Sequence, residues 1–405
     1  MRTVQGTFPE TMGPVVEAFS ATFDPAAGGA ALSIWHDGQE VVNIYGGLAD
    51  VRTQRPWAED TKTVLFSTTK GLAALTAAWL VANNRLDVDA PVSSVWPEFA
   101  VQGKESITVG DVLAHRAGLI APDDDMTIDD LIDIRAFAAR LAAQAPLWPS
   151  ASKHLYHPFT WGPLISEILR RATGEDLPEV FAREIATPLD AAVTLRADDH
   201  DVEQVAHVTA STEWSNQAAL IEKVLPKAAL RAFTAGGALP SDLVGAGGVN
   251  DPRVQKAGLV SAAGLGTASG LARIWSATVA STYGVRLLGD EDVKRLVAVR
   301  SEGAGWDALS EDGSEQRLVT PDGELTGDDS VSGSHPRWGA GVQLGSGSMT
   351  WLGPNSLGHD GAGGQTAFAD PDYGIAFAYL TNRVRATPPF GPIIDALRIT
   401  LDNRG

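Results

Sequence analysis

The stretch Phe66-Ser67-Thr68-Thr69-Lys70-Gly71 decides how the fold of this 405-residue chain is interpreted. The apolar run from Gly71 to Val81, rich in alanine and leucine, predicts a buried helix directly after it. If Ser67 begins that helix, Lys70 lies one turn further along on the same face. A serine hydroxyl needs a base beside it at neutral pH, and a helix N-terminus offers free N–H groups to a developing oxyanion. One turn of helix can therefore supply nucleophile, base and oxyanion donor.

The S-x-x-K pattern is weak evidence by itself, because Ser150-Ala151-Ser152-Lys153 matches it as well. The second match follows Pro149 and no apolar helix begins there, so we interpret it as a loop. For the first match the alternative is a helix whose N-terminus is capped by Ser67 and whose Lys70 points into solvent. Other segments of the sequence must decide whether Ser67 and Lys70 are catalytic or only cap a helix.

Two such segments follow. In Tyr156-His157-Pro158-Phe159-Thr160-Trp161-Gly162, a tyrosine next to a buried lysine would have a lowered phenol pKa and could shuttle protons. In Gly358-His359-Asp360-Gly361-Ala362-Gly363-Gly364, glycines allow the backbone to approach a ligand closely, and an N–H group there would be a second oxyanion donor. His359 adds a donor that can be charged. Taken singly, the first segment also fits a packed tyrosine at a helix start, and the second fits a glycine-rich turn.

The order and spacing of the three segments are far more specific than any one of them. The chain resembles the serine β-lactamase and penicillin-binding superfamily, and within it the family VIII carboxylesterases, which have a class C β-lactamase fold. The resemblance covers nearly the whole chain. The similar stretches are Phe66–Gly71, Leu113-Ala114-His115-Arg116-Ala117-Gly118-Leu119, Tyr156–Gly174, Gly258–Ser269 and Gly358–Asn382.

Carried over by position, the resemblance implies that Ser67 is the nucleophile, Lys70 its proton-transfer partner and Tyr156 the proton shuttle. It implies that the oxyanion hole is formed by the backbone N–H groups of Ser67 and Ala362. The segment His359-Asp360-Gly361 stands where β-lactamases carry Lys-Thr-Gly, so we expect it to bind substrate. We expect His157 to form a wall of the pocket, and we expect neither a cofactor nor a metal ion.

Departures from the β-lactamase pattern point to the esterases. Pro158 replaces the asparagine that would contact a β-lactam side-chain amide, His359 replaces the lysine and Asp360 the threonine. A permanent cation for the β-lactam carboxylate is therefore missing, and Asp360 would repel that carboxylate. An uncharged ester needs neither contact, so we expect a carboxylesterase acting on a small-molecule ester. The alternatives are a β-lactamase or DD-peptidase-like amide hydrolase, an acyltransferase, and a catalytically silent binding protein.

The composition of the chain restricts the classes of partner that it is expected to bind. The net charge of −19 repels phosphate backbones and anionic membranes, and no stripe of lysine and arginine could follow a nucleic acid. The absence of cysteine excludes disulfides and thiolate chemistry. His154 and His157 lie close together in sequence, but no third ligand has matching spacing for a metal. Without a secretory signal or a long apolar segment, the chain is expected to be a cytoplasmic protein. The oligomeric state stays open.

The remaining pattern predicts an α+β fold with one antiparallel sheet built from both ends of the chain and flanked by helices. Asp37-Gly38 predicts a tight hairpin between two strands. We expect an α/β domain from residues 1–75 and 250–405, a mostly helical domain from 76–249, and the active site at their interface. Expected strands are Ala30–Trp35, Glu40–Tyr45, Gln365–Ala369 and Ile375–Thr381; expected helices are Glu10–Phe23, Gly71–Val81, Trp161–Ala172 and Ile393–Leu401; Leu259–Ala280 is expected to be a loop leading into a helix, and Ser301–Ser334 a surface excursion.

Overall fold

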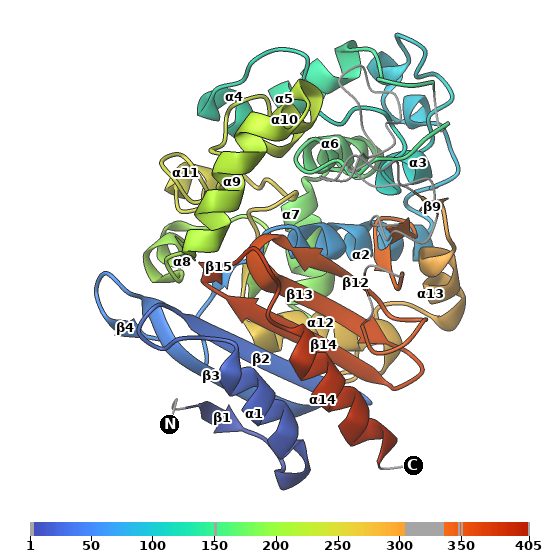
Figure 1. The fold of residues 1–405 in the computed structure, drawn as a ribbon. Coiled ribbons are helices and arrows are strands. Elements are labelled where there is room, and N and C mark those ends of the chain that lie inside the picture. Colours follow the sequence, from blue (N-terminus) through green and yellow to red (C-terminus); the bar gives the residue numbers. More distant parts are fainter. Residues whose placement is uncertain (1–3, 150–151, 304–335, 347–348, 350, 404–405) are drawn as a thin grey trace, which may run out of the picture.

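The computed structural model describes residues 4–149, 152–303, 336–346, 349 and 351–403. Its centre is a sheet whose strands come from the two ends of the chain (Figure 1). All neighbouring strands in this sheet are antiparallel, which confirms the predicted fold class. In spatial order the strands are β1 (Gln5–Thr7), β3 (Gln39–Asp50), β2 (Gly29–His36), β14 (Ile375–Thr381), β13 (Gln365–Asp370), β12 (Leu357–Gly361), β11 (Gln343–Leu344), β10 (Arg337–Trp338) and β9 (Ser301–Glu302), with β4 (Arg55–Pro56) paired to β3.

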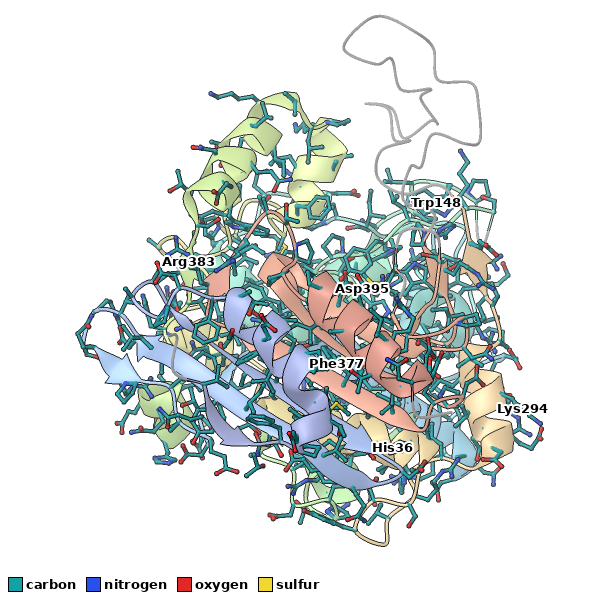
Figure 2. The ribbon with its side chains drawn as sticks, turned by 60° about the horizontal axis from the view of Figure 1, so that its bottom comes forward. His36, Trp148, Lys294, Phe377, Arg383 and Asp395 are labelled. Atoms are coloured by element: carbon teal, nitrogen blue, oxygen red, sulfur yellow. The ribbon has the colours of Figure 1, made fainter. Side chains whose placement is uncertain are left out.

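Alternation along β14 gives the sheet two different faces. Phe377 and Tyr379 point to one face, where helices α1 and α14 pack side by side (Figure 2). Ala376 and Ala378 point to the other face, where α12 packs. Side chains two residues apart share a face of a strand, so the bulky residues and the small ones are separated by the pleat. The bounds of these helices are α1 (Gly13–Ala21), α14 (Gly391–Asp402) and α12 (Ala268–Val279).

Between β4 and β9 the chain is mostly helical. This region holds a small sheet of β5, β8 and β6, and its strand β7 pairs in parallel with β15 near the C-terminal end. The α-helices are α2 (Thr68–Ala82), α3 (Val109–Leu113), α4 (Ile128–Ile132), α5 (Ile134–Ala143), α6 (Trp161–Thr173), α7 (Leu177–Phe181), α8 (Asp199–Gln204), α9 (Thr212–Val224), α10 (Lys227–Phe233), α11 (Pro252–Lys256) and α13 (Asp290–Val297), and the short strands are β5 (Thr63–Val64), β6 (Val193–Thr194), β7 (Thr209–Ala210), β8 (Leu265–Gly266) and β15 (Arg383–Val384).

Most predicted elements are present, with small differences at their ends. The helix expected from Glu10 begins as a 3-10 turn and becomes α1 only at Gly13, because Pro14 favours the first turn of a helix. The hairpin at Asp37-Gly38 is confirmed, since both residues have positive φ as a type I′ turn requires. The expected excursion from Ser301 instead begins with strand β9, which joins the sheet edge; residues 304–334 of it lie outside the described residues.

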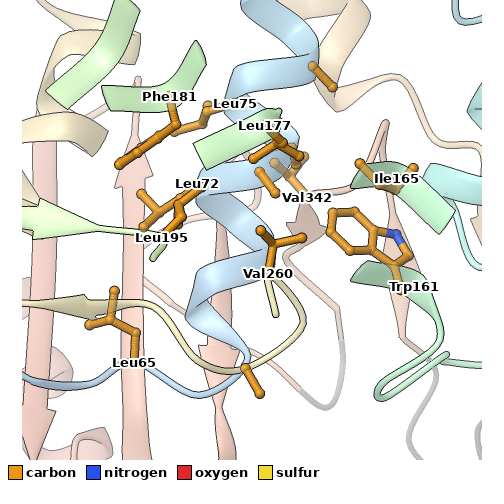
Figure 3. Close-up of a cluster of buried hydrophobic side chains, with 14 of the residues drawn as sticks. Leu65, Leu72, Leu75, Trp161, Ile165, Leu177, Phe181, Leu195, Val260 and Val342 are labelled. Atoms are coloured by element: carbon orange, nitrogen blue, oxygen red, sulfur yellow. The ribbon is translucent and has the colours of Figure 1, made fainter. Parts of the chain in front are cut away.

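A single hydrophobic cluster joins the sheet to the helical region, and α2 runs through it. Figure 3 shows Leu75 of α2 near Leu177 and Phe181 of α7, all fully buried. The same cluster includes Trp35 on the sheet. Truncating a fully buried leucine such as Leu75 to alanine typically costs about 2–5 kcal/mol. This shared core fixes α2 against both regions, while the division at residues 75 and 249 stays a prediction. No helix in the described ranges has the length and apolarity needed to cross a bilayer.

Candidate active site

Ser67 stands at the point where the chain turns from β5 into α2. Phe66, just before it, has φ +47, a conformation that non-glycine residues rarely adopt and that is found at functional sites. The side chains of Thr68 and Thr69 hold this turn by donating to the carbonyl oxygens of Leu65 and Phe66, at 2.7 and 2.6 Å. Ser67 is the N-cap residue of α2 and its side chain makes no capping bond. Its hydroxyl is therefore free to project into the adjoining pocket.

Lys70 is completely buried, one helical turn after Ser67. Its Nζ lies 3.1 Å from Ser67 Oγ and donates to the Ser261 carbonyl oxygen at 2.6 Å. Burial holds the pKa of the Lys70 amine well below its usual value of 10.5, and the negative charge of Asp360 opposes this only in part. A neutral amine has a lone pair, so Lys70 can accept the proton of the serine hydroxyl.

Tyr156 approaches Ser67 from the other side. Its hydroxyl donates to Ser67 Oγ at 2.9 Å, and its ring stacks on Trp338 with centroids 5.5 Å apart and planes 12° apart. The expectation of a lowered phenol pKa was wrong: burial raises the pKa of Tyr156 far above 10. Desolvation is the largest cause of this rise, and the negative charge of Asp360 adds to it. Tyr156 is thus a proton donor in the free protein.

The glycines of the third segment allow strand β12 to meet the start of α2. A Cβ atom on Gly361 would lie 2.9 Å from the Leu65 carbonyl oxygen, and one on Gly363 would lie 2.3 Å from Val384 Cβ. Gly363 also has φ +77, which favours glycine. Ala362, between them, lines the same pocket as Ser67. Within the described chain the Ser67 N–H has no acceptor, as an oxyanion donor requires.

The two histidines expected to contact substrate lie elsewhere. His157 is fully buried, accepts from the Leu119 N–H through Nε2 at 3.2 Å, and has Nδ1 2.6 Å from the Leu155 carbonyl oxygen. His359 is 1% exposed, with Nδ1 2.6 Å from the Asp360 carbonyl oxygen. Burial lowers the pKa of His157 to about 4 and that of His359 to about 3. Neither ring lines the pocket, so the pocket-wall position expected for His157 is not found, and the lowered pKa of His359 disfavours the charged form of that donor.

Asp360 does reach the pocket, as expected, with a side chain that is 38% exposed. Desolvation raises the pKa of its carboxyl to about 6. Its backbone N–H donates to Gln343 Oε1 on β11 at 3.2 Å, which fixes the segment to the sheet. The pocket entrance therefore carries a carboxyl group that ionises near neutral pH.

The pocket itself is a cavity of about 390 Å³ with mainly apolar walls. Helices α9 and α10 form much of it, and sequence reasoning identified none of their contributions. The amphipathic pattern of α9 was the signal that could have drawn attention to it. The lining residues are Ser67, Tyr156, Pro158, Phe159, Trp214, Gln217, Ala218, Ile221, Leu230, Phe233, Thr234, Ser241, Leu243, Asp360, Gly361, Ala362, Gly363, Arg385, Ala386 and Pro388.

Two further sequence interpretations can be placed. In the second S-x-x-K match, Ser150 and Ala151 lie outside the described residues, while the exposed Ser152 hydroxyl donates to the Pro149 carbonyl oxygen at 2.7 Å. Among the described residues, no group of three histidine, aspartate or glutamate side chains is arranged to hold a metal ion.

Comparisons with known proteins find similar proteins over nearly the full length of this chain. The family model described as Beta-lactamase matches residues 15–401. The chain is 32% identical over 391 residues to Esterase/beta-lactamase LipL of Mycobacterium tuberculosis, which covers 95% of this chain and 84% of that protein. A crystal structure of a family VIII carboxylesterase is similar with a TM-score of 0.82 and 26% identity, over 98% of this chain and 100% of that one. The structure of EstA from Arthrobacter nitroguajacolicus Rue61a is similar with a TM-score of 0.82 and 28% identity, over 100% of both chains.

Proposed function

Because the chain belongs to the Beta-lactamase family, we propose that it is a carboxylesterase that forms an acyl-enzyme on Ser67. The proposal rests on one observation: the hydroxyl of Ser67 lies within hydrogen-bond distance of both the Lys70 amine and the Tyr156 phenol, at the edge of an apolar pocket. A nucleophile that contacts its base and its acid directly is what acyl transfer requires.

The contacts around Ser67 suggest how its proton leaves. Tyr156 and Lys70 both donate to Ser67 Oγ, and Lys70 also donates to the Ser261 carbonyl oxygen. Burial lowers the pKa of the Lys70 amine, which favours the neutral form that can accept the Ser67 proton. The proton of Ser67 therefore moves to Lys70 as the serine oxygen attacks the ester carbonyl.

The later steps follow from the same contacts. The carbonyl oxygen becomes an oxyanion, which the N–H groups of Ser67 and Ala362 are proposed to stabilise. Tyr156 gives its proton to the leaving alcohol as the C–O bond breaks, and recovers a proton from the Lys70 ammonium. Water then attacks the acyl carbon while the Tyr156–Lys70 pair takes one of its protons, and the pair passes that proton to Ser67 Oγ as the acid leaves. Ester and water are consumed, and acid and alcohol are formed.

Esters fit the pocket walls better than β-lactams do. His359, at the position of the β-lactamase lysine, is buried and neutral, and Asp360 places a carboxyl at the entrance. Pro158, which lines the pocket, offers no amide to a β-lactam side chain. Rates with a chromogenic cephalosporin and an aryl ester, measured side by side, separate the two activities. The ester is expected to be hydrolysed with the higher kcat/KM.

The assignment is tested by replacing the nucleophile and comparing it with a matched serine. Ser67→Ala should abolish hydrolysis of a 4-nitrophenyl ester and labelling by a fluorophosphonate probe. Ser152→Ala, at an internal position of the other S-x-x-K match, should leave both unchanged because that hydroxyl is exposed and bonded to its own loop. Circular dichroism of both variants should match the wild type. Hydrolysis by Ser67→Ala near the wild-type rate would exclude the proposed mechanism.

A further inference from the structure

One arginine in the active-site pocket makes no direct side-chain bond to a partner, although its charge helps to lower the pKa of the Glu213 carboxyl. Arg385 follows strand β15, lines the pocket and is half-buried. Within the described ranges its side chain makes no hydrogen bond or ion pair, whereas every other arginine side chain there bonds to a carboxylate or a carbonyl oxygen. In a chain with 50 acidic and 31 basic residues, an arginine left unpaired is unusual.

The backbone fixes Arg385 next to the proposed oxyanion hole. Its N–H donates to the Gly363 carbonyl oxygen at 3.2 Å, one residue beyond Ala362. The walls around it are mainly apolar, and they include Ala386 and Pro388 on its own segment. The planar fork of donors on a guanidinium matches the two oxygens of a carboxylate. The site is thus equipped to bind one anionic group close to the reacting carbonyl.

The charges on the two sides of the oxyanion turn differ in sign. Asp360 precedes Gly361 and acts electrostatically on both Lys70 and Tyr156. Arg385 is bonded to the other end of the turn, at Gly363. An anionic group on a substrate would be repelled from the Asp360 side and attracted to the Arg385 side. Because Tyr156 protonates the leaving alcohol in the proposed mechanism, the alcohol lies on the Tyr156 side and the acyl chain extends towards Arg385.

We infer that the substrates of this enzyme carry a free carboxylate on the acyl chain, and that Arg385 binds it. This inference rests on the proposed function and names its substrate class: half-esters of dicarboxylic acids with an apolar chain between the two carbonyl carbons. A carboxylate carries one negative charge, which one guanidinium balances, whereas a phosphate dianion would leave charge unpaired among apolar walls. The sequence had suggested that a cation for a carboxylate was missing; Arg385 supplies one from a different segment.

The test compares two esters of equal chain length, 4-nitrophenyl hydrogen adipate and 4-nitrophenyl hexanoate. Spontaneous hydrolysis is subtracted with the Ser67→Ala variant. We expect the wild type to favour the adipate half-ester in kcat/KM. Arg385→Ala should lower the adipate-to-hexanoate ratio about 10- to 150-fold, the range for a hydrogen bond to a charged group, mostly through KM. Arg385→Lys should lower the ratio less, because the charge remains but the fork is lost.

Arg383 provides a matched control on the same segment. Its guanidinium donates to the Ala27 carbonyl oxygen at 3.2 Å and lies outside the pocket lining, so Arg383→Ala removes the same charge without touching the site. Its ratio should equal that of the wild type. In the wild type the ratio should fall as sodium chloride is added, because salt screens the attraction.

The outcomes distinguish this inference from the proposed function. If Ser67 is labelled and hexanoate is hydrolysed, but the ratio is unchanged in Arg385→Ala or falls equally in Arg383→Ala, carboxylate binding by Arg385 is refuted and the esterase proposal stands. If neither ester is hydrolysed and Ser67 is not labelled, the proposed function itself fails.

Discussion

Replacing Tyr156 with phenylalanine removes a single oxygen atom from the site. The ring keeps its stack on Trp338 and its contact with His115, whose centroids lie 5.5 and 4.8 Å away. One hydrogen bond of 2.9 Å to Ser67 is lost, and one partly buried hydroxyl no longer needs a partner. These effects on folding oppose each other, so the free energy of unfolding should change by no more than about 1 kcal/mol. Any large loss of activity then reports on chemistry rather than folding.

The size of that loss follows from the role assigned to the phenol. General acid–base catalysis contributes about 100- to 10,000-fold, which corresponds to about 3–5 kcal/mol of transition-state stabilisation. The need for a proton depends on the leaving group. The leaving group of an ethyl ester is ethoxide, which is strongly basic and requires the Tyr156 proton. The leaving group of a 4-nitrophenyl ester is 4-nitrophenolate, which is stable without a proton. Tyr156→Phe should therefore lower kcat/KM for the ethyl ester at least about tenfold more than for the 4-nitrophenyl ester.

The assay measures kcat/KM for both esters of one acid, since this quantity reports acylation alone. Tyr283→Phe serves as the control, because the Tyr283 side chain is exposed and lies outside the pocket lining. Equal losses for both esters would show that Tyr156 does not protonate the leaving group. Activity of Tyr156→Phe within threefold of the wild type on the ethyl ester would refute its role in proton transfer altogether.

Three further predictions follow from the buried surroundings of the site. Lys70→Met should lower kcat/KM at least about 100-fold, because it removes the base. In calorimetry the same variant should unfold at a temperature a few degrees higher. The reason is that a buried amine with a lowered pKa destabilises the folded state at every pH at which the unfolded chain binds the extra proton. In urea unfolding, Asp360→Asn should stabilise the protein by about 1 kcal/mol at pH 8 and not at pH 3. The folded-state pKa of Asp360 is about 6, above the usual 3.8, so its ionisation destabilises the folded state as pH rises from 3.8 to 6. Solvent that reaches the partly exposed side chain reduces the size of this effect. Trp338→Ala should reduce kcat about tenfold or more by freeing the Tyr156 ring, whereas Trp338→Phe should restore most of it in steady-state kinetics, and equal rates for the two variants would show that the stack does not position the phenol.

The fold was largely predictable because its signals are local. The Asp37-Gly38 hairpin and the α6 stop at Gly174, which has φ +79, depend on neighbouring residues alone. The strands on both sides of residue 372 carry buried residues throughout, which an apolar run predicts without any partner. The sheet edge from β9 to β11 was missed because these strands are two residues long, too short for a periodic pattern.

The residues of the candidate site were likewise predictable only where the signal is local in sequence. Ser67 and Lys70 are related by one turn of helix, which spacing alone specifies. Arg385 and Trp338 reach the site from segments far along the chain, and nothing in their neighbouring residues indicates this. The position of His157 was missed for a related reason: the sequence shows that it follows Tyr156, but not that its ring is fully buried and bonded to Leu119 and Leu155. Burial is also what reversed the expected pKa shift of Tyr156, since sequence proximity carries no measure of desolvation.

The central claim is that Ser67 carries the acyl group during turnover. Rapid acid quenching of the enzyme with a 4-nitrophenyl ester, followed by peptide mass spectrometry, tests it most directly. We predict a mass increase equal to the acyl group on the peptide containing Ser67, absent in Ser67→Ala and longer-lived in Tyr156→Phe. An acyl group found on another residue, or full turnover with no covalent intermediate in any variant, would contradict the account.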